Sequence, residues 1–280
     1  MKTQSFKLGL IGFPLGHSLS PKIHTAALRT CGLQGDYSLF SILPEDTQGL
    51  HDLLTRVRTG EIHGLNVTIP HKQNVISLLD ELTPTAKAIG AVNTIYLREN
   101  KLIGDNTDAA GFLSDLKRFV NRETSRQVNR SALVLGAGGS ARAVVYALLN
   151  DDWNVNLASR RIEQAQQLAN SFAGYGLQVT SYETFQPSRE AFNLIVNTTP
   201  LGMSPNIDQS PLPENMTLSK ETIVYDLVYN PRETKLVKDA RAQGLQATTG
   251  LGMLIEQAAL AFELWTGHTP PREILHTAVE

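Results

Sequence analysis

The chain has 280 residues, which is long enough for two domains with separate hydrophobic cores. Its formal net charge of −2 predicts no extended basic face for nucleic acid, and its single cysteine excludes a disulfide framework and a cysteine-based metal cluster. The N-terminus lacks the apolar segment of a signal peptide, and no apolar run is long enough to cross a membrane. We therefore expect a cytoplasmic protein that binds neither nucleic acid nor a membrane.

The first half of the chain alternates segments of strand type with segments of helix type, which is the pattern of an α/β domain. The predicted strands are Lys7–Phe13, Asp36–Ile42, His63–Ile69, Val92–Leu97 and Lys101–Gly104. The predicted helices run from Ser20 to about Cys31 and over Pro44–Thr59, Gln73–Leu82 and Ala109–Val120. Residues 121–130 are polar apart from Val128, and they predict a loop before the second half of the chain.

Two serines follow the first predicted strand. Ser20 stands directly before Pro21, so it is a candidate N-cap residue with the proline in the first turn of the helix. Capping does not explain Ser18. Two hydroxyl groups that are two residues apart at the carboxyl end of a strand suit the binding of a small polyol or a carboxylate.

A second polar group follows the strand His63–Ile69. Asn66 and Thr68 are two residues apart, so they project from the same face of that strand. Lys72 stands just beyond, at the start of a predicted helix, where the helix dipole disfavours a cation. That mismatch indicates a functional role for the lysine. Further along, Asp105 or Thr107 is predicted to cap the next helix.

A glycine-rich turn joins a short apolar strand, Ala132–Leu135, to a helix, Ala141–Leu149. Glycines allow a phosphate to approach the backbone, and the N–H groups and dipole at a helix N-terminus favour negative charge. The turn reads GAGGSA, with alanine in the third position of the dinucleotide fingerprint, a variant that the fingerprint allows. We expect a dinucleotide pyrophosphate to bind at Gly136, Ala137, Gly138, Gly139 and Ser140.

The next predicted strand, Val155–Ala158, is followed by Ser159, Arg160 and Arg161. An NAD site would place Asp or Glu here to accept a hydrogen bond from the ribose 2′-hydroxyl. Two guanidinium groups would instead attract a 2′-phosphate and hold it with paired hydrogen bonds. Alternatively, the arginines are solvated charges at the start of a helix. At this distance from a glycine turn the pattern favours NADP.

The rest of the chain continues the alternation of strands and helices. The further predicted strands are Leu177–Thr180, Asn193–Thr198, Thr222–Leu227 and Leu245–Ala247. The further predicted helices are Ile162–Phe172, Arg232–Ala242, a long helix from Gly250 to about Trp265, and Pro271–Ala278. Between them, Leu201–Leu218 is rich in proline and predicts a loop.

Seven short segments together resemble the shikimate dehydrogenase family, whose members use NADP in aromatic amino-acid biosynthesis. No single segment is decisive, but all seven occur in order and with family-like spacing over nearly the whole chain. They are Ser18-Leu19-Ser20-Pro21, Asn66 to Lys72, Gly90 to Thr94, Gly104 to Asp108, the glycine turn, Asp226 to Pro231, and Gly250-Leu251-Gly252-Met253.

The resemblance implies a two-domain α/β fold with the active site in the cleft between the domains. Residues 1–112 with 248–280 would form a substrate-binding domain completed by C-terminal helices, and residues 113–247 a Rossmann-like NADP-binding domain. The implied activity is the reversible, NADPH-dependent reduction of 3-dehydroshikimate to shikimate, with Lys72 and Asp108 as the catalytic pair and no metal.

The resemblance also implies the binding residues. Those that would hold the substrate are Ser18, Ser20, Asn66, Thr68, Asn93, Asp108, Tyr229 and Gln257. Leu227 and Gly250 would contact the cofactor, and Arg160 would carry most of the grip on the 2′-phosphate, since Ser159 and Arg161 depart from the family pattern. His71, next to Lys72, is not expected to be catalytic.

The residues leave several alternatives open. Lys72 can donate a proton to the forming alkoxide, or it can act as a fixed cation while water supplies the proton. Other candidate functions are an NAD-dependent quinate/shikimate dehydrogenase, a folate dehydrogenase of similar design, and a non-catalytic sensor of shikimate-pathway metabolites. Arg160 argues against NAD, and a sensor has no need for Lys72 together with Asp108. Both a monomer and a homodimer remain possible.

Overall fold

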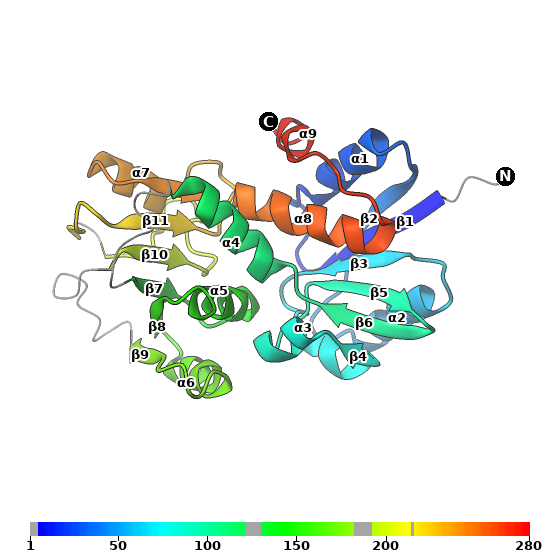
Figure 1. The fold of residues 1–280 in the computed structure, drawn as a ribbon, viewed down its shortest axis with the longest axis horizontal. Coiled ribbons are helices and arrows are strands. Elements are labelled where there is room, and N and C mark those ends of the chain that lie inside the picture. Colours follow the sequence, from blue (N-terminus) through cyan, green and yellow to red (C-terminus); the bar gives the residue numbers. More distant parts are fainter. Residues whose placement is uncertain (1–4, 121–129, 182–191, 214–215) are drawn as a thin grey trace. The chain divides into compact units, whose positions relative to one another are not determined.

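The computed structural model describes residues 5–120, 130–181, 192–213 and 216–280, which form two compact units (Figure 1). The first unit comprises Met1–Gly111 and Ile255–Glu280, and the second comprises Phe112–Leu254. The chain thus enters the second unit one residue earlier, and leaves it seven residues later, than the resemblance implies. No helix of the described residues is long and apolar enough to cross a membrane. Apart from Arg130, the predicted loop at 121–130 lies outside the described residues.

The first unit contains a six-stranded mixed sheet in the order β2-β1-β3-β5-β6-β4. β1 pairs in parallel with both β2 and β3, whereas β5 is antiparallel to β3 and to β6. The strands are β1 (Ser5–Gly12), β2 (Gln34–Ser41), β3 (Gly64–Val67), β4 (Glu81–Leu82), β5 (Thr94–Arg98) and β6 (Lys101–Asp105).

The β5–β6 hairpin turns through Glu99 and Asn100, whose φ angles are 51° and 61°. Left-handed backbone at both central residues is typical of the two-residue turn that matches the twist of hairpin strands. The two strands predicted on either side of this turn are confirmed. Because Thr94 pairs with Asp105, the start of β5 and the end of β6 lie at the same edge of the sheet.

Among the described residues, five helices lie wholly in the first unit, where an apolar core that includes Leu53, Val57, Leu65 and Ile95 joins the helix Thr47–Arg58 to the sheet. α4 (Asp108–Phe119) and α8 (Leu251–Thr266) each begin in one unit and end in the other. The five are α1 (Ser20–Thr30), α2 (Thr47–Arg58), the 3₁₀ helix η1 (Asn74–Leu78), α3 (Pro84–Ile89) and α9 (Arg272–Thr277).

The helix predicted over Gln73–Leu82 is wrong. Only the short η1 forms, and the chain then extends into β4 and pairs with β6. Asp80 explains the change, because its backbone N–H donates to the Leu102 carbonyl and its carboxylate accepts from the Leu102 N–H at 2.7 Å. These bonds favour an extended backbone over another helical turn. Thr83, as N-cap, then begins α3.

The second unit contains a parallel six-stranded sheet in the order β12-β11-β10-β7-β8-β9, with three helices between its strands (Figure 1). The strands are β7 (Ser131–Leu135), β8 (Asn154–Ser159), β9 (Gln178–Ser181), β10 (Leu194–Asn197), β11 (Ile223–Asp226) and β12 (Ala247–Thr249), and the helices are α5 (Gly139–Leu149), α6 (Ile162–Ser171) and α7 (Lys235–Ala242). The strand order reverses between β7 and β10, which is where open α/β sheets of this kind bind ligands. The two-domain α/β fold predicted from the sequence is confirmed.

A buried carboxyl, Asp226, organises the ends of two central strands of the second unit. It is fully buried and accepts hydrogen bonds from Asn197 Nδ2 at 2.8 Å, from the Val228 N–H at 3.0 Å and from the Thr234 hydroxyl at 2.6 Å. Burial raises the pKa of Asp226 to about 6, although these three donors oppose the rise. The network joins the end of β10, the end of β11 and the start of α7.

This raised pKa predicts a dependence of stability on pH. A carboxyl whose pKa is higher in the folded state stabilises the fold fully below its unfolded pKa of about 3.9, and that stabilisation is lost as pH rises through about 6. We expect the free energy of unfolding of the native chain, relative to that of Asp226→Asn, to fall by up to about 3 kcal/mol between pH 4 and pH 7. Urea unfolding of both proteins across this range measures the difference, and a difference independent of pH would contradict the expectation.

Candidate active site

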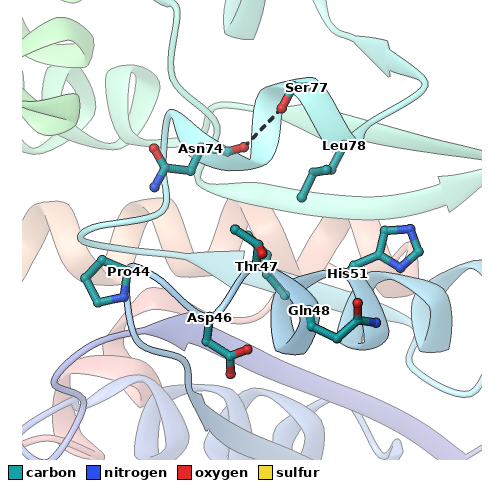
Figure 2. Close-up of a pocket in the computed structure, with 9 residues that line it drawn as sticks. Pro44, Asp46, Thr47, Gln48, His51, Asn74, Ser77 and Leu78 are labelled. Carbon is teal, nitrogen blue, oxygen red and sulfur yellow. Dashed lines mark hydrogen bonds between the residues drawn. The ribbon is translucent and has the colours of Figure 1, made fainter.

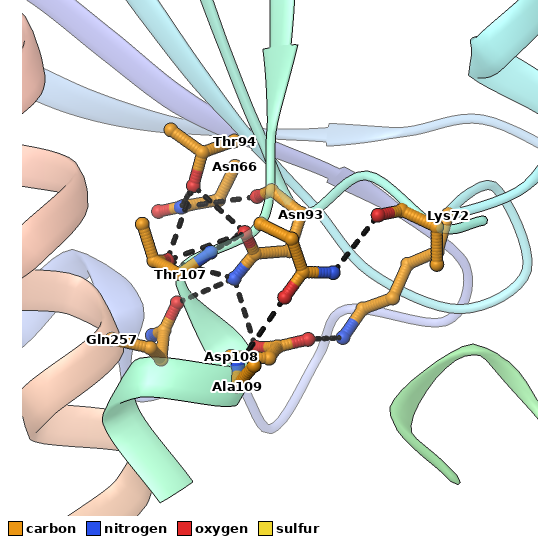
Figure 3. Close-up of polar contacts among 10 residues, drawn as sticks. Asn66, Lys72, Asn93, Thr94, Thr107, Asp108, Ala109 and Gln257 are labelled. Atoms are coloured by element: carbon orange, nitrogen blue, oxygen red, sulfur yellow. Dashed lines mark hydrogen bonds and ion pairs between the residues drawn. The ribbon is translucent and has the colours of Figure 1, made fainter. Parts of the chain in front are cut away.

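Lys72 and Asp108 form a buried ion pair in the first unit (Figure 3). Lys72 Nζ lies 2.5 Å from Asp108 Oδ2, and the two side chains are 10% and 6% exposed. Lys72 lies in the turn after β3, and its carbonyl accepts a hydrogen bond from the Val92 N–H at 2.7 Å. Asp108 is the first residue of α4, where the helix dipole favours a carboxylate. The mismatch expected for Lys72 does not arise, because no α-helix begins at Lys72 and its cation is paired with Asp108.

Asn93 fixes Asp108 from the other side. Its Nδ2 donates to Asp108 Oδ1 at 2.8 Å and also lies 2.9 Å from Thr107 Oγ1 and 3.2 Å from Gln257 Oε1. Its Oδ1 accepts from the Thr107 N–H at 2.7 Å and from the Thr94 hydroxyl at 3.0 Å. Both carboxylate oxygens of Asp108 are therefore engaged, one by Asn93 and one by Lys72, so the pair is held in one geometry.

Asn66 lies in β3, and Thr68 lies just beyond its end, in the segment that leads to Lys72. Asn66 is 4% exposed, and its Nδ2 donates to the Asn93 carbonyl at 3.3 Å and to Thr94 Oγ1 at 3.4 Å. Thr68 is half-buried just beyond β3, and its hydroxyl bonds to no other described residue. The structure thus brings Asn66, Asn93 and Gln257 into one cluster with the ion pair and places Thr68 at its margin.

Ser18 and Ser20 follow β1, and Lys72 follows the neighbouring β3, so all three lie beyond the carboxyl ends of these strands. β1 and β3 are parallel neighbours, and the Phe13 N–H donates to the Ile69 carbonyl at 2.9 Å just beyond their ends. Ser18 Oγ accepts from the Ser20 N–H at 3.3 Å. The predicted capping role of Ser20 is wrong, because Leu19 occupies the N-cap position and already has helical backbone angles. The Ser20 hydroxyl bonds to no other described residue and can serve a ligand.

Of the two candidate caps of α4, Thr107 stands directly before the first helical residue, but neither Thr107 nor Asp105 makes the side-chain capping bond. Asn106 Oδ1, rather than Asp105 or Thr107, accepts from the Ala109 N–H, at 3.3 Å. Asp105 instead accepts from the Thr83 hydroxyl at 2.6 Å, and Thr107 is bound to Asn93. The side chains of both candidate caps, Asp105 and Thr107, are therefore engaged in hydrogen bonds with residues far away in the sequence.

In the second unit the glycine turn follows β7 at the point where strand order reverses. Gly136 has a φ of 108°, and a Cβ there would lie 2.7 Å from Thr198 Oγ1, so only glycine suits both the backbone and the space. Gly138 occupies the N-cap position of α5, and a Cβ there would meet no atom within 4 Å. Ala137 is buried, Gly138 is exposed, and Gly139 and Ser140 are half-buried in the first turn of the helix. Open space above a helix N-terminus fits a pyrophosphate.

Ser159, Arg160 and Arg161 follow β8, the strand next to β7. Ser159 is buried, and its hydroxyl accepts from the Arg161 N–H at 3.2 Å, which shapes the turn. The Arg160 and Arg161 side chains are exposed and form no hydrogen bond or ion pair with another described residue. Both guanidinium groups can therefore accept an anionic ligand beside the glycine turn.

The remaining expected residues lie at the same carboxyl edge of the second sheet. Leu227 follows β11 and Gly250 follows β12, and a Cβ on Gly250 would lie 2.3 Å from the Leu227 carbonyl oxygen. Glycine at 250 is thus required for this backbone contact. Tyr229 is half-buried in the segment after β11, and burial raises the pKa of its hydroxyl. It belongs to the second unit, unlike the other expected substrate residues.

Sequence reasoning missed several partners that hold this site together. Thr94 and Thr107 bind Asn93 from both ends of the hairpin, and Tyr37 donates to Asn66 Oδ1 at 2.8 Å from β2. Thr94 and Thr107 stand inside quoted segments, so their positions offered a signal. Tyr37 lies 29 residues from Asn66 in the chain, and no local pattern connects them.

A pocket of 390 Å³ lies elsewhere on the first unit, over α2 and η1 (Figure 2). Most of its polar side chains are exposed, and Asp46 within it already accepts from the Gly49 N–H as the N-cap of α2. None of the expected site residues lines it. Its lining residues are Pro44, Asp46, Thr47, Gln48, Leu50, His51, Asn74, Ser77 and Leu78. No group of three or more His, Cys, Asp or Glu residues suited to a metal occurs among the described residues.

The two-unit α/β fold is that of an oxidoreductase that uses a nicotinamide dinucleotide. Three family models match the chain: the shikimate dehydrogenase substrate binding domain over residues 10–95, shikimate / quinate 5-dehydrogenase over 118–241, and the shikimate 5'-dehydrogenase C-terminal domain over 250–280. The chain belongs to the shikimate dehydrogenase family, as its sequence segments indicated.

The alignments with individual relatives cover nearly all of this chain and nearly all of each relative. Shikimate dehydrogenase (NADP+) of Bacillus licheniformis is 41% identical over 273 residues, which cover 97% of this chain and 95% of the relative. The Thermus thermophilus enzyme, solved with NADP(H) and shikimate, is 38% identical with a TM-score of 0.84 and 98% coverage of each chain. Quinate dehydrogenase of Corynebacterium glutamicum, solved with NAD, is 32% identical with a TM-score of 0.87 and 98% coverage of each chain. The fold alone therefore does not show whether the substrate is shikimate or quinate.

The hydrogen bonding of Ser20 predicts that this residue contributes to ligand binding and not to stability. We expect Ser20→Ala to change the free energy of unfolding by less than about 0.5 kcal/mol, because no capping bond is lost. Asp46→Ala is the matched control: it removes the carboxylate that accepts from the Gly49 N–H at 2.8 Å and should cost about 1 kcal/mol. Urea unfolding compares the two variants, and an equal loss in Ser20→Ala would restore the capping role.

Proposed function

We propose that the protein catalyses the reversible, NADPH-dependent reduction of 3-dehydroshikimate to shikimate in aromatic amino-acid biosynthesis. The observation that carries this proposal is the buried pair of Lys72 and Asp108, 2.5 Å apart, at the sheet edge that also presents Ser18 and Ser20. A buried lysine and carboxylate at the same end of the sheet as two serine hydroxyls that can still donate suit a small, hydroxylated substrate that must exchange a proton. Family membership supports the same reaction.

The substrate role of each residue follows from what its side chain can offer. The Ser20 hydroxyl has no partner among the described residues, and Ser18 keeps its hydroxyl hydrogen available while its oxygen accepts from the Ser20 N–H. These two groups suit the substrate carboxylate, which needs donors. Asn66, Thr68, Asn93 and Gln257, around the ion pair, suit the ring hydroxyls. We also assign Tyr229 to substrate binding, on the family resemblance alone.

Lys72 acts on the oxygen of the reacting carbonyl. Reduction turns that oxygen into an alkoxide, and the ammonium stabilises the developing charge because it is held in a site that excludes bulk water. Lys72 then transfers a proton to the alkoxide directly, or a water molecule supplies it while the lysine stays charged. Asp108 is the hydrogen-bond partner of Lys72 in both routes. It orients the ammonium, and Asn93 orients Asp108 in turn.

NADPH, when bound, supplies the hydride for this reduction. The residues that would hold its pyrophosphate are Gly136, Ala137, Gly138, Gly139 and Ser140, at the N-terminus of α5. Arg160, with Arg161 beside it, would pair with the 2′-phosphate, and Ser159 shapes the turn that presents them. Leu227 and Gly250 would border the same site, because their backbones touch at the carboxyl edge of the sheet.

The main alternative is an NAD-dependent quinate/shikimate dehydrogenase, since a quinate dehydrogenase has nearly the same fold. The choice of NADP rests on Arg160 and Arg161, which stand where an NAD site would carry an acidic residue. A sensor without catalysis would not need a lysine and an aspartate held as a buried pair. The cytoplasmic location and the oligomeric state, monomer or homodimer, stay predictions.

Initial rates of shikimate oxidation, compared with NADP and NAD and with quinate as the control substrate, test the proposed function. We expect rapid turnover only with shikimate and NADP. In Arg160→Ala, kcat/KM for NADP should fall about 10- to 100-fold, because one or two charged hydrogen bonds are lost, while the rate with NAD stays within about twofold.

Two results would overturn this proposal. Comparable rates with quinate or NAD would identify the alternative dehydrogenase, and NADP binding without turnover of either substrate would leave a sensor. Arg161→Ala is the matched control for cofactor choice, because it removes a second exposed guanidinium from the same turn. If kcat/KM for NADP falls further in Arg161→Ala than in Arg160→Ala, then Arg161 is the main ligand of the 2′-phosphate.

A further inference from the structure

Asn66 is held from behind by a tyrosine that belongs to a different strand. The hydroxyl of Tyr37, in β2, donates to Asn66 Oδ1 at 2.8 Å, and Tyr37 is only 8% exposed. On the basis of the function proposed above, we propose that Tyr37 is a positioning residue for substrate binding, which acts by fixing the amide of Asn66. Because its hydroxyl binds Asn66, a residue assigned to the substrate, its effect should fall on substrate affinity.

The hydrogen bonds of Asn66 determine which end of its amide faces which neighbour. A backbone carbonyl can only accept, so the contact with the Asn93 carbonyl at 3.3 Å requires the Nδ2 end there. The Tyr37 hydroxyl donates to the opposite, Oδ1 end. The Asn93 carbonyl therefore fixes which end of the amide carries the nitrogen, and the Tyr37 hydroxyl holds the oxygen end in place. The contacts of Nδ2 are long, at 3.3 and 3.4 Å, so the 2.8 Å bond from Tyr37 is the strongest of the set.

The Tyr37 ring is itself fixed by aromatic packing. His24, in α1, stacks on it with ring centroids 4.3 Å apart and an interplanar angle of 1°, and Trp265 lies against His24 at 5.3 Å. His24 is fully buried, and neither of its ring nitrogens has a hydrogen-bond partner among the described residues. Burial lowers the pKa of His24 to about 3, against a smaller opposing effect of Asn66, so the ring is neutral at assay pH.

An unbonded, neutral and buried imidazole serves here as a flat aromatic surface. A leucine or valine could fill the volume, but it would not hold a phenol ring in a parallel plane. The stack and the hydrogen bond therefore form one line of contacts, from α1 through β2 to β3, that ends on a residue assigned to the substrate. Removal of the hydroxyl leaves Asn66 Oδ1 without its strongest partner, and the amide gains freedom to turn away from the substrate.

The test is Tyr37→Phe, with Tyr96→Phe as its matched control. Tyr96, in β5 of the same sheet, is also 8% exposed, and its hydroxyl bonds to no other described residue. We expect Tyr37→Phe to raise KM for shikimate about fivefold to tenfold, the value of one hydrogen bond, with kcat and the KM for NADP within about twofold. Tyr96→Phe should leave all three constants within about twofold.

A double-mutant cycle with Asn66→Ala separates positioning from a general loss of structure. If Tyr37 acts through Asn66, then adding Tyr37→Phe to Asn66→Ala should change KM by less than twofold. A fivefold rise in that background, or an unchanged KM in Tyr37→Phe alone, would overturn the inference. Turnover of shikimate by the native enzyme is measured first, so failure of the proposed function is distinguished from failure of this step.

His24→Ala provides a second route if Tyr37→Phe does not fold. It removes the stacking surface while it keeps the hydroxyl, and it should raise KM for shikimate through the same loss of Asn66 orientation. In this variant too, the rise should disappear in the Asn66→Ala background. If His24→Ala still raises KM for shikimate in the Asn66→Ala background, then His24 does not act through Asn66. This result would contradict the inference whatever the melting temperatures of the variants.

Discussion

The buried pair of Lys72 and Asp108 is the interaction on which the rest of the first unit depends. Two charges out of water are tolerated only where further hydrogen bonds complete them. Asn93 provides that completion for Asp108, and it is held in turn by Thr94, Thr107 and Gln257. The mixed sheet makes this possible, because two parallel strands and one antiparallel hairpin bring the end of β3, the start of β5 and the end of β6 to one edge.

Most of the fold could be predicted from the sequence, because its elements carry strong local signals. The glycine turn between β7 and α5 and the pair of strands β5 and β6 are examples. The predicted helix over Gln73–Leu82 failed for a reason that local patterns do not contain. The bonds of Asp80 with Leu102 draw the chain into β4, and they join residues 22 positions apart.

The candidate site was predictable in its residue types but not in its connections. Lys72 and Asp108 are 36 residues apart, and only the resemblance paired them before the structure placed them 2.5 Å apart. The capping roles given to Ser20 and Asp105 failed, and Thr107 stands directly before α4 without making the capping bond. Capping is judged from local spacing, whereas tertiary partners or helix geometry decided each case. Asn93 was expected to hold substrate, and its hydrogen bonds also make it the organiser of Asp108.

The proposed mechanism requires that Lys72 and Asp108 act as one unit in turnover of shikimate. A double-mutant cycle of Lys72→Ala and Asp108→Asn, read as kcat for NADP-linked shikimate oxidation, tests this requirement. We expect each single variant to lose about 10²- to 10⁴-fold in kcat, the double variant to be little worse than the poorer single one, and NADP affinity to be nearly unchanged. Losses that multiply, or near-normal turnover of Lys72→Ala, would contradict the mechanism.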